Sequence, residues 1–294
     1  MTLGITLSIV ASILFSSLYL FVGLLDSTSA VDVFAWRIVL LFPIVMILLV
    51  LSNDRDNLVS ILAKIRTHYS ILPLLVLSSF LIGVQQWLFL WAPLNGRGLQ
   101  VSIGYFLLPL TMIFVGRVLY GERLSFFQKL AAALAFIGIC NEFSQSFSIS
   151  WETLVVALGF PLYFVLRKSL STDNISGFFI DLLLLLPACI WLVLDSHELI
   201  QQQGQIFNMV IVGLISAIAL ICYLMASKFL PMGIFGLLGN VEPVLLVVAS
   251  LIIGETIDED QWYTFIPIWL SLCVLTLEGG IAVIRKNFKR HIPS

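Results

Sequence analysis

Residues 99–123 read LQVSIGYFLLPLTMIFVGRVLYGER, a long apolar run that ends near Arg117 and Arg123 and includes a Gly-Glu pair. A helix needs about 20 mainly apolar residues to cross the hydrocarbon core of a bilayer. Backbone groups inside that core must be hydrogen-bonded within their own segment, so an apolar run of this length must be a helix. The stretch therefore predicts a membrane-spanning helix with basic residues at one end.

The whole chain has the composition of a membrane protein. Of its 294 residues, 60% are hydrophobic and 11% are charged, whereas a soluble domain carries about 25% charged residues. A protein with so few polar groups cannot cover its surface in water, so lipid must be its solvent. Apolar runs and short turns use nearly all of the length, which leaves no room for a soluble domain.

The sequence predicts an all-α membrane protein with ten transmembrane helices. We expect them at residues 3–25, 31–51, 69–91, 99–119, 125–143, 150–169, 175–195, 206–227, 233–253 and 262–284. The first run lacks a basic segment before it and an Ala-x-Ala-type exit after it, and it is long enough to span. We therefore interpret it as a transmembrane helix rather than a signal peptide.

The basic residues predict which loops face the cytoplasm. Of the 15 Lys and Arg residues, 13 fall in alternate gaps between the apolar runs. They are Arg55, Lys64, Arg66, Arg117, Arg123, Lys129, Arg167, Lys168, Lys228, Arg285, Lys286, Lys289 and Arg290. Arg97 and several acidic residues, among them Glu255, fall on the opposite side. Because basic loops stay in the cytoplasm, we expect both termini inside.

An internal repeat relates the two halves of the chain. The fourth helix carries Gly104 and Pro109 and ends in Gly121-Glu122, while the ninth carries Gly239 and Pro243 and ends in Gly254-Glu255. We interpret both Gly-Glu pairs as turns that end a helix. Each copy is fourth in a set of five helices, and because five is odd the second set enters the membrane from the opposite face. We expect two inverted five-helix repeats, residues 1–145 and 146–294, as in many secondary transporters.

Two stretches resemble the RarD-like permeases of the drug/metabolite transporter (DMT) superfamily, with EamA-type repeats. The matching residues are Trp91-Ala92, Asn95, Leu99, Ser102, Gly104-Tyr105-Phe106, Pro109-Leu110, Gly116 and Gly121-Glu122-Arg123, then Tyr163, Arg167-Lys168, Gly177, Asp181 and Leu186-Pro187. Asp32, Arg37, Trp269 and Glu278 also match. The resemblance implies a ten-helix permease of the bacterial cytoplasmic (inner) membrane, with export as a candidate direction.

The chain departs from the family pattern at three places. Phe15-Ser16 stands where the family usually shows Trp-Gly, and Leu108 precedes Pro109 where Asn is typical. Glu242 precedes Pro243 where a small neutral residue is expected. These positions should line or shape the cavity, so the substrate of other members is not carried over.

Four ionisable side chains fall inside predicted helices: Arg37, Asp181, Glu242 and Glu278. Such groups are costly in lipid, at roughly 2.5–3.5 kcal/mol near the centre, and often mark substrate or ion pathways. A carboxylate in a low-dielectric site can bind and release a proton near neutral pH. Glu242 is the first candidate because it is near the midplane and adjoins Pro243. The alternatives are an ion pair of Arg37 with Glu242, and pairs of Asp181 and Glu278 with basic groups at the cytoplasmic surface.

Other residues are predicted to line the same cavity. Tyr105 and Tyr163 carry hydroxyl groups that need partners when buried. Gln86 is one of two adjacent amides with Gln85, of which at most one can face lipid comfortably. Pro109 and Pro243 each remove a backbone hydrogen bond and can kink their helices at the cavity.

These features predict a secondary transporter of small metabolites or amphipathic drugs, coupled to protons and working by alternating access, with its site between the repeats near the midplane. The alternative is a channel or a membrane-embedded sensor without coupled transport. We expect no enzyme, because the three His residues lie in loops or the tail and no Gly-x-Ser-x-Gly motif occurs. We expect no metal and no cofactor, and no nucleic-acid partner. The expected partners are the substrate, protons and membrane lipids, with the chain as a monomer or homodimer.

Overall fold

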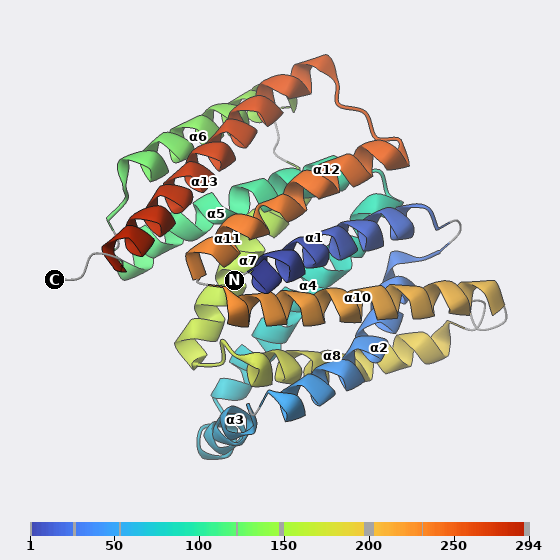
Figure 1. Cartoon of the computed structure of the whole chain (residues 1–294). Coiled ribbons are helices and arrows are strands. Elements are labelled where there is room, and N and C mark those ends of the chain that lie inside the picture. The colour runs from blue at the N-terminus through green and yellow to red at the C-terminus, as the bar shows by residue number, and fades with distance from the viewer. Residues whose placement is uncertain are drawn as a thin grey trace. The chain divides into compact units, whose positions relative to one another are not determined.

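The computed structural model describes residues 2–25, 28–52, 54–121, 123–146, 150–196, 203–230 and 232–290. Every regular element in these ranges is a helix (Figure 1). The helices are α1 (Thr2–Gly23), α2 (Ala30–Leu51), α3 (Arg55–Thr67), α4 (Ile71–Leu94), α5 (Gly98–Tyr120), α6 (Phe126–Ser146), α7 (Trp151–Leu170), α8 (Ile175–Asp195), α10 (Gln203–Phe229), α11 (Met232–Gly239), α12 (Val241–Ile253), the 3₁₀ turn η1 (Glu259–Gln261) and α13 (Trp262–Arg290).

The lengths of these helices confirm the all-α membrane class. Within the described residues, nine helices are long and apolar enough to cross a bilayer, and α12 is a shorter apolar helix. Lipid rather than water is the solvent for their outer faces, which carry many large exposed hydrophobic side chains such as Phe80, Phe114 and Phe136. The chain is an integral, multi-pass membrane protein.

The segment after the second span contains a helix that the sequence analysis did not predict. α3 mixes polar and apolar residues, so no long apolar run marks it. Its Ile61 is buried against Leu75 of α4 and Ile180 of α8, and Lys64 donates a hydrogen bond to the Leu170 carbonyl (3.3 Å). Tertiary contacts with three other helices therefore stabilise a segment whose composition alone resembles a loop.

The predicted helix at 233–253 is wrong as a single element, because the chain is interrupted at Asn240 between α11 and α12. Pro243 has no N–H group, and its ring clashes with the carbonyl of the residue four positions earlier, which is Gly239. Ending α11 at Gly239 removes this clash and places Pro243 in the first turn of α12, where an N–H group would have no helical partner anyway. By contrast, α5 runs through Pro109 without a break.

The two Gly-Glu pairs end their helices in the same way. Gly121 closes α5 with φ of 67° and Gly254 closes α12 with φ of 111°, both in the left-handed region that glycine adopts at low cost. The predicted turns are thus confirmed at both glycines. Glu122 lies outside the described residues.

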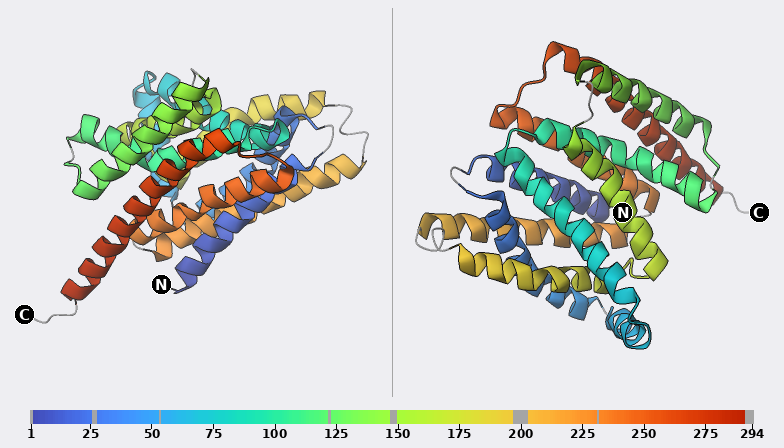
Figure 2. Two further views of the ribbon diagram at one scale, coloured as in Figure 1. Left: turned by 90° about the horizontal axis from the view of Figure 1, so that it is seen from above. Right: turned by 180° about the vertical axis from the view of Figure 1, so that it is seen from behind.

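Contacts between helices divide the chain into two compact units. Unit 1 is Met1–Leu20, Gly96–Leu158 and Ile218–Ser294, and unit 2 is Phe21–Asn95 and Gly159–Ala217. In unit 1, α5 packs with α12, and α6 runs beside α13 (Figures 1 and 2). In unit 2, α2 packs with α8. Each of these pairs joins helices that hold the same position in the two predicted repeats. The boundary between the repeats at residue 145 stays a prediction.

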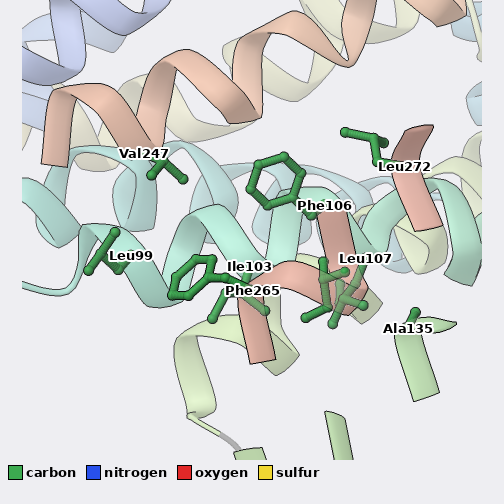
Figure 3. Close-up of a cluster of buried hydrophobic side chains, with 10 residues drawn as sticks. Leu99, Ile103, Phe106, Leu107, Ala135, Val247, Phe265 and Leu272 are labelled. Atoms are coloured by element: carbon green, nitrogen blue, oxygen red, sulfur yellow. The ribbon is translucent and has the colours of Figure 1, made fainter. Parts of the chain in front are cut away.

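The hydrophobic core of unit 1 forms around α5. Leu99, Ile103, Phe106 and Leu107 of α5 contact side chains from α6, α7, α12 and α13, among them Phe265 (Figure 3). Gly104 lies on the same helix, and a Cβ added there would come within 2.6 Å of the Val156 Cβ atom and 3.0 Å of the Thr153 carbonyl oxygen. A small residue lets the two helix backbones approach closely, which is a common way to pack helices in membranes.

Hydrogen bonds between helix ends agree with an alternating path through the membrane. In unit 2, Asp54 after α2 accepts hydrogen bonds from Ser176 at the start of α8. In unit 1, Glu255 after α12 contacts Gly98 at the start of α5. The basic-residue pattern assigns both ends joined by Asp54 and Ser176 to the cytoplasmic side. It assigns both ends joined by Glu255 and Gly98 to the outer side.

We predict that Gly104→Ala lowers the stability of the protein, because the new methyl group overlaps Val156 and the backbone of α7. The expected loss is about 1–3 kcal/mol, as for other overpacked cores. Gly280→Ala is the matched control, since nothing lies within 4 Å of its added Cβ. Thermal unfolding of the purified variants in detergent measures the difference, and equal melting temperatures would contradict the close approach at Gly104.

Candidate functional site

A buried cluster of polar side chains joins α7 to α8. The Arg167 Nη1 atom lies 2.6 Å from Asp181 Oδ2, and the Tyr163 hydroxyl donates to the same oxygen at 2.9 Å. Arg167 Nη1 also donates to the Tyr163 hydroxyl oxygen at 2.5 Å. Tyr163 and Arg167 are four residues apart and so share one face of α7. No more than 5% of any of the three residues is exposed.

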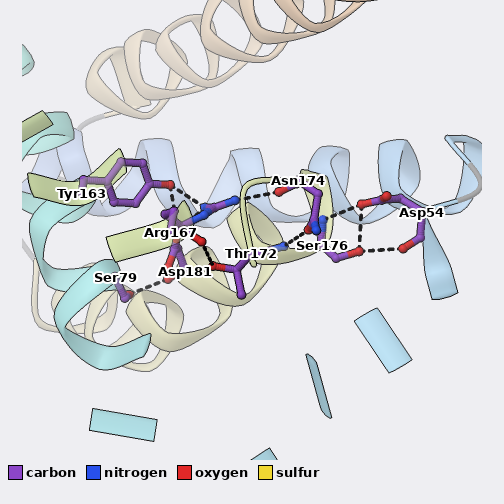
Figure 4. Close-up of polar contacts among 9 residues, drawn as sticks. Asp54, Ser79, Tyr163, Arg167, Thr172, Asn174, Ser176 and Asp181 are labelled. Carbon is purple, nitrogen blue, oxygen red and sulfur yellow. Dashed lines mark hydrogen bonds and ion pairs between the residues drawn. The ribbon is translucent and has the colours of Figure 1, made fainter. Parts of the chain in front are cut away.

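Neighbouring polar groups fix this cluster in place (Figure 4). Arg167 Nη2 donates to the Asn174 carbonyl at 2.7 Å, and the Asn174 side chain caps α8 by accepting from the Gly177 N–H group at 2.9 Å. From α4, the Ser79 hydroxyl donates to the Asp181 carbonyl at 2.7 Å. The guanidinium group is therefore bonded to the start of α8, and Ser79 joins α4 to the backbone of α8 at Asp181.

The cluster still has polar atoms without partners. Asp181 Oδ1 and Arg167 Nε are buried and form no hydrogen bond with any residue that the structure describes. A buried ion pair contributes little net stability, because desolvation offsets the attraction, whereas losing one partner leaves an uncompensated buried charge. The pair is thus a rigid polar contact inside the unit, with one carboxylate oxygen left over.

The structure brings Tyr163 and Asp181 together as candidate site residues and adds Arg167, which the sequence analysis counted among the basic residues of the cytoplasmic side. The alternative in which Asp181 pairs with a basic residue is confirmed, whereas the burial of Arg167 was not predicted. Its spacing of four from Tyr163 on one helix was the available signal.

Glu242 lies at the helix interruption in unit 1. It is half-buried in the first turn of α12, close enough to Tyr223 of α10 for a direct electrostatic interaction. The Tyr223 ring packs edge-on against Phe235 of α11 and Phe15 of α1, with centroids 4.8 Å and 6.5 Å away. The carboxylate thus interacts with Tyr223, whose ring belongs to a group of three aromatic rings.

Side chains of α13 support the interruption. The Asn240 amide donates to the Thr276 hydroxyl at 3.1 Å, and that hydroxyl donates to the Leu272 carbonyl at 2.8 Å. The break between α11 and α12 is therefore fixed by a specific contact with α13.

The other predicted site residues are distributed between the units. In unit 2, the Arg37 guanidinium carbon lies 5.5 Å from the centre of the Phe89 ring, a distance typical of a cation–π contact. Gln85 is buried and touches Gly159, while the predicted Gln86 is half-buried. In unit 1, Tyr105 and Glu278 are half-buried. Among the described residues, no three His, Cys, Asp or Glu side chains are grouped as a metal site would require.

We predict that Asp181→Asn and Arg167→Gln each destabilise the protein by about 3–5 kcal/mol, because each leaves a buried charge without its partner. The double variant Arg167→Met with Asp181→Leu should lose less than the sum of the two single losses. Exposed Asp173→Asn is the control. Thermal unfolding of all variants gives the coupling energy, and strictly additive losses would contradict a direct ion pair.

Comparison with known proteins identifies the family of this chain. Residues 2–141 match the EamA-like transporter family. The chain is 37% identical to an uncharacterized transporter of Haemophilus influenzae, over 98% of both chains. It is 39% identical to the chloramphenicol-sensitive protein RarD of Pseudomonas aeruginosa, also over 98% of both chains. One crystal structure shares the fold, with a TM-score of 0.53 and 16% identity over 95% of this chain and 98% of that one.

The Haemophilus influenzae relative is named a transporter, and the similarity to both relatives extends over nearly the whole length of the chain. The family and this relative show that the chain is a non-enzymatic membrane transporter. A transporter of this kind acts on a small-molecule substrate. The chain belongs to the EamA-like transporter family and, within the DMT superfamily, to its RarD-like permeases.

Proposed function

We propose that the protein is a proton-coupled secondary transporter of small metabolites or amphipathic drugs, and that it works by alternating access as a monomer or homodimer. The observation that carries this proposal is the interruption between α11 and α12, with Glu242 in the first turn after it. Discontinuous helices near the membrane midplane form the substrate and coupling-ion sites of many secondary transporters.

The chemistry at this interruption suits a proton or a cationic group. The positive end of the α12 dipole favours an anion in its first turn, which stabilises the Glu242 carboxylate. A proton or an organic cation that binds this carboxylate neutralises its charge in lipid. Because one acidic group cannot bind both at once, binding of the substrate and binding of the proton compete, and this competition couples their transport.

The aromatic surroundings indicate the class of substrate. Phe15, Tyr223 and Phe235 offer ring faces and edges to an apolar or amphipathic molecule. Aromatic faces also attract cations, by about 0.5–2 kcal/mol depending on desolvation. An amphipathic cation therefore fits the site better than an anion does.

The helix pairing supports alternating access. Within the units, α5 packs with α12, α6 with α13, and α2 with α8, each joining counterparts from the proposed repeats 1–145 and 146–294. Two inverted repeats packed in this way can exchange roles, so that each in turn closes one side of the membrane. The proposed site lies at the midplane between the repeats. The basic-residue pattern supports both termini in the cytoplasm, and the bacterial relatives support an inner-membrane location with export as the proposed direction.

We predict that Glu242→Gln abolishes proton-coupled transport, because the amide can neither release a proton nor pair with a cation. Purified protein in liposomes that contain a pH-sensitive dye is given a panel of metabolites and amphipathic drugs. The panel begins with amphipathic organic cations, which the site favours, and includes chloramphenicol, an uncharged drug that appears in the name of one relative. The wild-type protein should move protons when a substrate is added, and the variant should not.

Exposed Glu259→Gln is the matched control and should transport like the wild type. Counterflow, in which unlabelled substrate inside the liposome drives uptake of labelled substrate, separates a carrier from a channel. Proton movement that persists in Glu242→Gln, or flux without counterflow in the wild type, contradicts the proposal.

A further inference from the structure

The Glu255 side chain joins two helices that are far apart in the sequence. Its Oε1 atom accepts a hydrogen bond from the Gly98 N–H group at 2.7 Å, and Oε2 accepts one from the Leu99 N–H group at 2.8 Å. Both donors belong to the first turn of α5, where N–H groups have no partner within the helix. The Glu255 backbone is tied to the end of α12 through a hydrogen bond to the Ser250 carbonyl at 3.0 Å. We call the two contacts to α5 the Glu255 cap.

The surroundings of the cap are closely packed. A Cβ atom added at Gly98 would meet the Ser250 hydroxyl, Glu255 Oε1 at 2.6 Å and the Tyr19 hydroxyl at 2.7 Å. Only glycine allows the carboxylate to approach the backbone of α5 so closely. The cap therefore needs a specific residue at each end, unlike an ordinary surface contact.

Arg97, the residue before α5, is the basic group that acts on this carboxylate among the described residues; it also pairs at 3.7 Å with Glu152 of α7. Tyr19 faces the cap from α1, and Asp258, Glu259 and Asp260 follow on the loop that carries Glu255. Both oxygens of Glu255 accept bonds from neutral N–H groups rather than from a basic side chain. A proton on the carboxyl group would remove its charge and leave only one good acceptor oxygen, so the cap depends on the ionised form.

We propose that Glu255 is a proton-binding site that controls the contact between α12 and α5: the ionised carboxylate holds the two helix ends together, and protonation releases them. Its role in transport rests on the proton coupling and on the membrane orientation proposed above, which place Glu255 on the outer side. A proton arriving from outside would then loosen the end of the helix pair that carries Glu242 in α12.

The electrostatics of the site agree with this role. Burial raises the pKa of the Glu255 carboxyl group above that of a free glutamate, and the hydrogen bonds from Leu99 and Gly98 and the charge of Arg97 oppose the rise only in part. The cap is present above this raised pKa and is lost as the pH falls through it. A raised pKa brings the change closer to neutral pH.

The internal repeat places a second glutamate at the position that corresponds to Glu255. Glu122 follows Gly121 at the end of α5 as Glu255 follows Gly254 at the end of α12. Glu122 lies outside the described residues, so the proposal concerns Glu255 alone.

Amide hydrogen exchange of Gly98 and Leu99 in the full chain, purified in detergent, tests the cap directly. Without Glu255 these two N–H groups have no acceptor, so their protection reports the cap. After correction for the intrinsic rate, protection in the wild type should fall about tenfold or more between about pH 7.5 and about pH 5. Glu255→Gln should be unprotected or weakly protected at both pH values, and Glu259→Gln should behave like the wild type.

Equal protection of the wild type at both pH values overturns the proposal, as does full protection in Glu255→Gln. Transport in liposomes tests the role: flux through Glu255→Gln should lose its dependence on outer pH, and an unchanged pH profile contradicts that role. These results are separable from the proposed function. If Glu242→Gln still moves protons while the exchange of Gly98 and Leu99 depends on pH, proton coupling at Glu242 fails and the proton site at Glu255 stands.

Discussion

The absence of water in the bilayer core is the constraint on which this structure depends. Every backbone N–H and carbonyl group there needs a partner inside the protein. Continuous helices satisfy this need, and the few places where the chain departs from a continuous helix therefore require specific partners. At Asn240 the side-chain amide bonds the Thr276 hydroxyl and joins the interruption to α13. At the start of α5 the partner is the Glu255 carboxylate.

The same constraint explains why charged side chains are rare and grouped. Arg167 and Asp181 neutralise one another, and Tyr163 and Asn174 add hydrogen bonds to Asp181 Oδ2 and Arg167 Nη2. This cluster orders the ends of α7 and α8 and gives unit 2 a rigid polar interior. Glu242 and Glu255 both belong to α12 or the turn that ends it. A helix that is broken at one end and held through a carboxylate at the other is suited to move during a transport cycle.

The sequence predicted the spans well because lipid selects for long apolar runs, which can be counted directly. It missed α3 because that helix is short and amphipathic, and contacts such as Ile61 with Leu75 and Ile180 stabilise it. It placed a kink at Pro243 but not the interruption at Asn240, whose side chain contacts Thr276, 36 residues further along. The sequence offered pairing of Asp181 with a basic group as an alternative but did not identify Arg167 as the partner, and it missed the cap of Glu255, since a residue's charge does not identify a partner on another helix. The repeated Gly-Glu pair was visible in the sequence, but only the structure shows that its second glutamate binds α5.

Proton release on substrate binding tests the central claim most directly, because it measures competition at Glu242 without any membrane or gradient. A substrate found in the transport screen is added to the purified protein in weakly buffered detergent solution, and the pH change is recorded. The account predicts that the wild type releases protons when the substrate binds and that Glu242→Gln releases none. Equal proton release from both proteins would contradict it.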